Sequence, residues 1–330
     1  MNAWALAVAG YAVIAAMISA YVLLDGFDLG VGAISLWIGK TDGQRAEAME
    51  AIAPFWNGNE VWLIAAGAAL FALFPRAYAS SFSGFYLPFI VVLWLLMFRG
   101  IALELRGHFN GELWHQFWDA AFSLSSALLI LVFGVALGNL LRGVPLDALG
   151  YFRGTFGFLL NPYALGAGLF ALAALANHGA AFLAYRTGGE LQRSARRVQR
   201  AAWWVVVALY VALTVATYFV RGIPPIALSA AMTVASVAAI VAMKVARSRN
   251  RDLATFLASS VFIASLLVEA AGSMFPYLLP GYPMGSGGLS IFDAAPSTTA
   301  VACALAITVG GGIAVLVYGT WVARRLGATK

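Results

Sequence analysis

The sequence Tyr21-Val-Leu-Leu-Asp-Gly-Phe-Asp-Leu-Gly30 places two aspartates inside the first long apolar stretch of the chain. No charged side chain precedes Asp25, and the apolar pattern continues after Asp28 to Gly39. A carboxylate at the centre of a bilayer costs about 3 kcal/mol on insertion scales, so these side chains should face protein or water. Because they are three residues apart, they share one face of a helix. The pattern predicts a functional polar site within a membrane-spanning helix.

The composition is that of a polytopic membrane protein. Of the 330 residues, 62% are hydrophobic and 10% are charged, with a mean hydropathy of +0.86, whereas soluble domains are about 25% charged. Apolar windows of about 20 residues predict an all-α fold with a single integral membrane domain over 1–330. The nine predicted spans are approximately 3–39, 51–74, 79–103, 116–141, 161–185, 200–220, 223–246, 254–279 and 299–324.

The basic residues predict the orientation of these spans. An odd number of spans puts the termini on opposite sides, and an N-terminus outside leaves only Arg76, Arg142, Arg153 and Arg221 in the outer loops. The other 16 of the 20 basic residues then lie inside, as the positive-inside rule requires. The net charge of +6 is therefore a topology signal, and no nucleic-acid role is expected.

The composition of two connecting segments predicts their local structure. The glycine-rich loop 281–297 is expected to be a flexible external segment. The basic stretch 186–200 is expected to be a short amphipathic piece at the membrane surface.

A second polar cluster opens the second predicted span, with Asn57, Asn59, Glu60 and Trp62 close together. In lipid the polar groups of such a cluster must form hydrogen bonds with neighbouring helices. The cluster is therefore either functional or serves to hold helices together by hydrogen bonds. Trp62 also fits an interfacial aromatic belt. Two alternatives likewise stay open for the aspartates of the first span. They form a proton path or polar gate, with a proton shared between them, or they are a structural cap next to glycines that allow close helix packing.

The remaining candidates for chemistry are isolated. His108 and His115 lie in or next to a loop, and His178 lies near the end of the fifth predicted span. A haem needs an axial ligand facing a roomy pocket, so His178 is a weak candidate and a packing role is favoured. Glu269 is a weak candidate inside the eighth predicted span. The single cysteine, Cys303, excludes an internal disulfide and a cysteine-based metal site, and no metal site is predicted.

Several longer motifs together resemble subunit II of the cytochrome bd-type quinol oxidases. The resemblance is dense over the first 145 residues and looser afterwards. The motifs are Asp25-Gly-Phe-Asp-Leu-Gly-Val-Gly32, Pro54-Phe-Trp-Asn-Gly-Asn-Glu-Val-Trp-Leu63, Ala72-Leu-Phe-Pro-Arg-Ala-Tyr-Ala79, Phe82-Ser-Gly-Phe-Tyr86, Phe98-Arg-Gly-Ile-Ala-Leu-Glu104, Gly138-Asn-Leu-Leu-Arg-Gly-Val-Pro145, Leu160-Asn-Pro162 and Met274-Phe-Pro276.

The resemblance implies two four-helix bundles plus a peripheral helix, and a heterodimer in the bacterial inner membrane with a periplasmic N-terminus and a cytoplasmic C-terminus. Subunit I of such a complex carries the quinol site and haems b and d, and reduces oxygen to water. The resemblance associates Asp25 and Asp28 with proton delivery, Trp62 with an oxygen path, and Arg99 and Glu104 with stable assembly.

The same resemblance implies membrane lipid, ubiquinol as substrate, and in some members a structural quinone in subunit II or a small accessory subunit. Two alternatives compete with it. A secondary transporter would also use intramembrane carboxylates, but this sequence lacks evident paired repeats. A pure scaffold would brace its partner with aspartates that are only structural.

Overall fold

The computed structural model describes residues 2–222 and 226–327, and almost all of them are helical. The elements follow one another as α1 (Ala3–Ile38), α2 (Asp42–Ile52), α3 (Trp56–Leu73), α4 (Pro75–Gly84), α5 (Tyr86–Leu105), the 3₁₀ helix η1 (Arg106–His108), α6 (Glu112–Arg142), α7 (Phe156–Leu159), α8 (Pro162–Arg186), α9 (Gly189–Arg221), α10 (Ile226–Ser248), α11 (Asp252–Met274), β1 (Tyr277–Pro280), β2 (Gly288–Ser290), α12 (Ile291–Ala294) and α13 (Thr298–Gly327).

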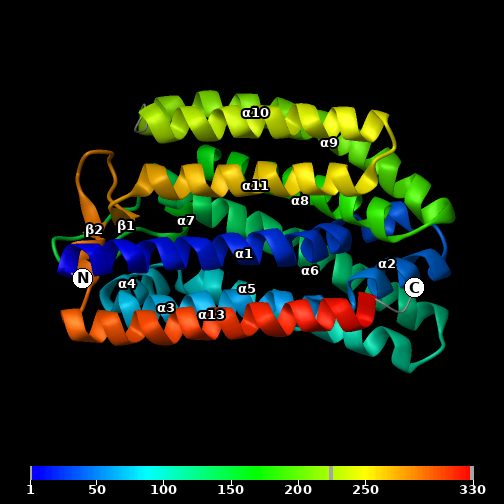
Figure 1. The fold of residues 1–330 in the computed structure, drawn as a ribbon, viewed down its shortest axis with the longest axis horizontal. Helices are drawn as coiled ribbons and strands as arrows, with labels where there is room; N and C mark the ends of the chain where they lie inside the picture. Colours follow the sequence, from blue (N-terminus) through cyan, green and yellow to red (C-terminus); the bar gives the residue numbers. More distant parts are fainter. Residues whose placement is uncertain (1, 223–225, 328–330) are drawn as a thin grey trace.

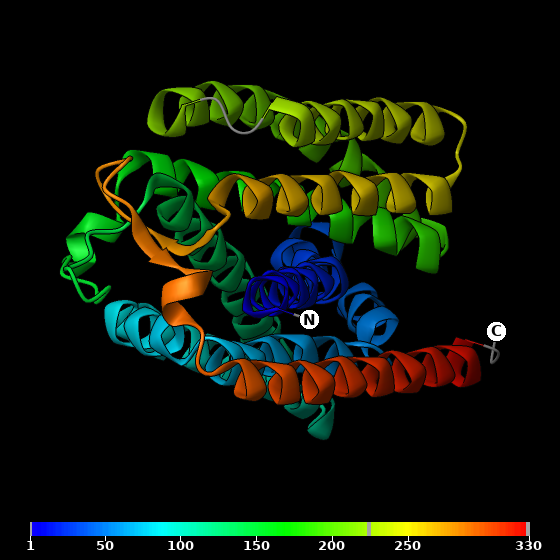
Figure 2. The same ribbon diagram turned by 60° about the vertical axis from the view of Figure 1, so that its left-hand side comes forward.

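The long helices lie roughly side by side around α1 (Figure 1). One group consists of α1, α3, α5 and α6, and a second consists of α8, α9, α10 and α11. The two groups meet where α8 packs against α1 and α6, and α13 lies on the outside against α3 and α1. Figure 2 shows the same separation, with α9 and α10 on the far side of α11 from α13. The expectation of an all-α fold with two bundles and a peripheral helix is confirmed.

Each of the nine predicted spans overlaps a long helix, but not all of these helices are equally apolar. Within residues 2–222 and 226–327, eight helices are long and apolar enough to cross a membrane. The exception is α3, because its 18 residues begin with the polar sequence Trp-Asn-Gly-Asn-Glu. The second span is therefore shorter and more polar than predicted.

Several predicted span boundaries differ from the helix ends in the structure. The second predicted span starts too early, because a separate helix, α2, begins at the capping box of Thr41 and Gln44 and continues to Ile52, whereas α3 begins only at Trp56. The predicted third span is divided at Phe85 into α4 and α5. The predicted surface piece 186–200 is continuous with the sixth span, since α9 runs unbroken from Gly189. The joint predicted at 222–225 lies partly outside the described residues.

The loop after α11 has regular elements in place of the flexible segment that its composition predicts. Residues up to 279 were expected to be helical, but β1 and β2 form an antiparallel hairpin in which Leu279 lies opposite Leu289. A guanidinium nitrogen of Arg76 donates a 2.8 Å hydrogen bond to the carbonyl oxygen of Asp293, which ties α12 to α4. The loop therefore covers one end of the helices.

Glycines allow α1 and α8 to approach closely, as predicted. A Cβ atom on Gly30 would overlap the carbonyl oxygen of Leu175, and a Cβ atom on Gly179 would overlap the backbone of Gly30 and Val31. Small residues at such contacts let helix backbones meet in a membrane. This contact fixes α8 against the polar segment of α1.

Candidate functional site

The first element of the site is a buried ion pair between α1 and α5. The two terminal guanidinium nitrogens of Arg99, Nη1 and Nη2, donate hydrogen bonds of 2.9 and 2.5 Å to the two carboxylate oxygens of Asp25. Both side chains are fully buried. The orientation prediction counts Arg99 among the basic residues of the inner loops, but Arg99 lies within α5, and its buried side chain meets the aspartate. A bidentate pair of this kind fixes both groups in position.

Asp28 has a different environment from Asp25, although both are fully buried. One carboxylate oxygen of Asp28 accepts a 2.7 Å hydrogen bond from the amide of Asn59, which also donates to the carbonyl oxygen of Leu24 at 3.1 Å. The other oxygen has no hydrogen-bond partner among the described residues. Both oxygens of Asp25 already accept hydrogen bonds from Arg99, and a proton shared between the two aspartates stays a prediction.

Two further groups complete what we call the α1 cluster, defined by Tyr21, Asp25, Asp28, Glu60 and Arg99 together with Asn59. The half-buried Glu60 lies close enough to Asp25 and Arg99 for electrostatic interaction. The buried hydroxyl of Tyr21 interacts in the same way with Asp25, Arg99 and Glu60.

The sequence of α1 explains why three residues of the α1 cluster lie on the same side of this helix. Tyr21, Asp25 and Asp28 follow one another at spacings of four and three residues, which aligns them on one face of α1. The start of α3 is next to that face, and the positive end of its helix dipole favours nearby carboxylates. The cluster is thus built from three helices.

Other residues predicted from sequence lie outside the α1 cluster. Asn57 is exposed, because it points away from the face of α3 that carries Asn59. Trp62 is buried in the apolar core between α1 and α3. Glu104 is exposed near the end of α5 and lies more than one turn beyond Arg99. Only part of the predicted polar cluster is therefore brought together.

His178 is a packing residue in this structure. It is fully buried, with Nδ1 2.7 Å from the hydroxyl of Ser259 and Nε2 3.2 Å from the carbonyl oxygen of Leu23. Its ring stacks on Phe256, with centroids 4.9 Å apart. Both nitrogens are engaged and aromatic rings occupy the surroundings, so this histidine does not fit an axial haem ligand.

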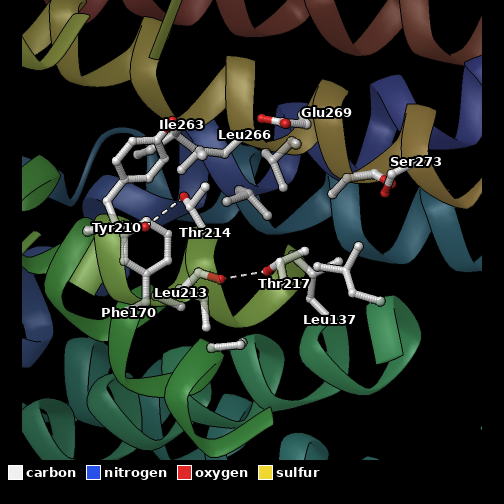
Figure 3. Close-up of a pocket in the computed structure, with 18 of the residues that line it drawn as sticks. Leu137, Phe170, Tyr210, Leu213, Thr214, Thr217, Ile263, Leu266, Glu269 and Ser273 are labelled. Atoms are coloured by element: carbon white, nitrogen blue, oxygen red, sulfur yellow. Dashed lines mark hydrogen bonds between the residues drawn. The ribbon is translucent and has the colours of Figure 1, made fainter. Parts of the chain in front are cut away.

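Glu269 lines a large cavity in the second helix group. The cavity has a volume of about 350 Å³ and is enclosed mainly by α6, α8, α9, α10 and α11. Figure 3 shows Glu269 and Ser273 along α11, with Leu213 and Thr217 on α9. The hydroxyl of Ser229 donates a 2.8 Å hydrogen bond to a carboxylate oxygen of Glu269. No histidine is among the described residues that line this cavity.

Sequence reasoning missed a second ionic cluster, at the end of the fold opposite the N-terminus. Asp119 on α6 is almost fully buried and accepts hydrogen bonds of 2.6 Å from the Nε atoms of both Arg45 and Arg106. Arg106 also donates a 2.6 Å bond to Asp42, which lies 3.1 Å from His115. These residues come from three separate elements, α2, η1 and α6. Their positions near span ends indicated only surface charges, and no sequence spacing links them.

We expect Asp119→Asn to lower the unfolding temperature of the purified protein by about 5 °C, because two arginines lose their shared carboxylate. The measurement is thermal unfolding followed by intrinsic fluorescence. Glu112→Gln is the matched control, since Glu112 is an exposed carboxylate at the start of the same helix. Equal midpoints for the two variants would contradict a stabilising role of this cluster.

Comparison with known proteins assigns the family. The model of cytochrome bd terminal oxidase subunit II matches residues 6–326. The chain belongs to the cytochrome bd terminal oxidase subunit II family. The cytochrome bd-I ubiquinol oxidase subunit 2 of Escherichia coli K12 is 32% identical over 338 residues, which cover 91% of this chain and 89% of that protein. The cytochrome bd ubiquinol oxidase subunit 2 of Bacillus subtilis 168 is 35% identical over 196 residues, covering 59% and 58% of the two chains.

A solved structure supports the fold of this subunit II. The bd oxidase from Geobacillus thermodenitrificans matches with a TM-score of 0.80 at 20% sequence identity, over 99% of this chain and 100% of that one. The resemblance found from the sequence motifs is therefore confirmed. The chain is a multi-pass membrane subunit of a bacterial respiratory oxidase, and a second subunit must accompany it. The transporter alternative gains no support from these relatives.

Proposed function

We propose that this chain acts in the bacterial inner membrane as the subunit of a quinol oxidase that supports a haem-bearing subunit I. The complex oxidises ubiquinol and reduces oxygen to water, and haems b and d in the partner supply the redox chemistry. The main support is the match to subunit II proteins over nearly the whole chain. Both ring nitrogens of the buried His178 are engaged by Ser259 and Leu23, which supports placing the haems in the partner.

The orientation we propose has the N-terminus in the periplasm and the C-terminal end of α13 in the cytoplasm. In Figure 1 the start of α1 and the end of α13 lie at opposite ends of the molecule. The end opposite the N-terminus contains α2, η1, the start of α9 and the α10–α11 connection, where most basic residues are concentrated. This concentration agrees with the positive-inside rule.

Within the α1 cluster, Asp28 is the group that we propose to carry protons toward the partner subunit. Its only described side-chain partner is a neutral amide, and one of its oxygens is free to bind a proton. Asp25 accepts hydrogen bonds from both terminal nitrogens of Arg99. It therefore keeps Arg99 in place and contributes to the electrostatic potential at Asp28. Glu60, which is half-buried, connects this cluster toward the surface of α3.

The other predicted roles remain part of the proposal. Trp62 lines an oxygen path along α3. Arg99 contributes to assembly through its buried ion pair. Glu104 contributes to assembly from an exposed position on α5 that a partner can reach.

A reduced-minus-oxidised visible spectrum tests the assignment as an oxidase subunit. The tagged chain should be purified in mild detergent from its native membrane. We expect the bands of haem b and haem d together with a larger co-purifying polypeptide. A haem-free chain without a partner, isolated from a membrane that still contains the oxidase, would overturn the assignment.

Asp28→Asn tests the proton role. We expect the rate of oxygen consumption to fall about 10²-fold, because asparagine keeps the hydrogen bonding and cannot exchange a proton. Haem content and the yield of intact complex should stay unchanged. Glu47→Gln, an exposed carboxylate change on α2, is the control. Loss of the complex with normal turnover per haem would instead support the pure scaffold.

A further inference from the structure

The cavity lined by Glu269 has the dimensions of one lipid leaflet. Its lining follows α9 from Arg221, at the end of the helix, back to Tyr210. Eleven residues of helix span about 16 Å, which is close to half of the ~30 Å hydrocarbon thickness of a bilayer. Apolar side chains dominate the inner part (Figure 3). An apolar chain that enters at the helix ends and reaches the middle of the membrane matches this shape.

Opposite charges lie at the outer end of the cavity. The guanidinium group of Arg221 donates hydrogen bonds to the backbone carbonyl oxygens of Leu141, at 2.7 Å, and of Ser273. These bonds use two of its five N–H donors. Glu269 lies one helical turn, about 5.4 Å, before Ser273. Among the side chains that the structure describes, neither Arg221 nor Glu269 forms a salt bridge.

We propose that this cavity binds a phospholipid with an ethanolamine headgroup, with one acyl chain inside, the phosphate at Arg221 and the ammonium group at Glu269. The cation and the anion on the protein complement the two charges of this headgroup. An anionic phospholipid would place no positive group at Glu269, and a quaternary ammonium has no N–H donor for the carboxylate. The carbonyl oxygens of a quinone can accept hydrogen bonds from Arg221 but offer no donor to Glu269. The proposal does not depend on the proton role of the α1 cluster.

The test uses the intact complex with its partner subunit, washed in detergent and analysed for bound phospholipid classes by mass spectrometry. We expect the native protein to retain at least one phosphatidylethanolamine per complex. Glu269→Gln keeps the shape and removes the charge, so retention should fall about tenfold. Glu190→Gln removes an exposed carboxylate at the opposite end of α9 and should leave retention unchanged.

Two additional measurements identify the ligand and its location. Delipidated complex is incubated with mixed micelles containing equal amounts of dioleoyl phosphatidylethanolamine and dioleoyl phosphatidylglycerol. The native protein should prefer the first lipid, and Glu269→Lys should reverse the preference. Leu213→Trp, which fills the cavity, should abolish the retained lipid. Equal retention by the native and Glu269→Gln proteins, or a quinone as the molecule displaced by Leu213→Trp, would overturn the proposal.

Discussion

Replacing Arg99 by leucine is expected to prevent accumulation of the folded protein. Asp25 would stay fully buried without its cation, and removing one partner of a buried ion pair costs about 3–5 kcal/mol of the free energy of unfolding. This is a large part of the 5–15 kcal/mol that stabilises an ordinary protein domain. The measurement is the amount of intact complex in the membrane, together with its unfolding temperature after purification.

Two comparisons separate the ion pair from a general effect of losing an arginine. Arg193→Leu removes an exposed arginine near the start of α9 and should be harmless. The double variant Asp25→Leu/Arg99→Leu removes both charges and should recover much of the lost stability, because an apolar pair avoids the cost of burying charge. Normal accumulation of the Arg99→Leu protein would show that the pair is not needed for folding.

Gly179→Ala is the second substitution with a large expected effect. Its Cβ atom would overlap the backbone of Gly30 and Val31, where no flexible side chain can move aside. We expect α1 and α8 to be forced apart, which would cost about 3 kcal/mol or more and displace the Asp25 and Asp28 segment. The measurement is the yield of folded complex and its unfolding temperature.

Gly166→Ala is the matched control for this prediction, since it lies on the same helix. Its added methyl group would meet only a side-chain atom of Leu213, at an ordinary contact distance of 3.7 Å. Substitution there should be tolerated. If both alanine variants fold equally well, then the close contact between α1 and α8 does not limit helix packing.

The sequence alone predicted the features that depend on local spacing. The positions of Asp25 and Asp28 on one face of a long helix follow from helical periodicity. The close approach of another helix at the glycines next to the aspartates follows from small residues inside an apolar span. Both features are confirmed, as are the long helices that form the two bundles.

The sequence could not predict which distant residues meet. Arg99 lies 74 positions after Asp25, and its apparent place near a span end suggested contact with water. Asp119 joins two arginines from other segments, and no spacing in the sequence links the three residues. The exposed position of Glu104 depends on how α5 is rotated against α6, which the packing of whole helices decides. Such pairings need the three-dimensional arrangement.

Arg99 also offsets part of the negative charge that is buried in the α1 cluster. Asp25, Asp28 and Arg99 together carry one net negative charge when both aspartates are ionised, and none when Asp28 binds a proton. Arg99 interacts electrostatically with both aspartates, so the three groups are treated together. With Arg99 in place, the net charge of these three buried groups therefore differs from zero by no more than one unit in either protonation state of Asp28.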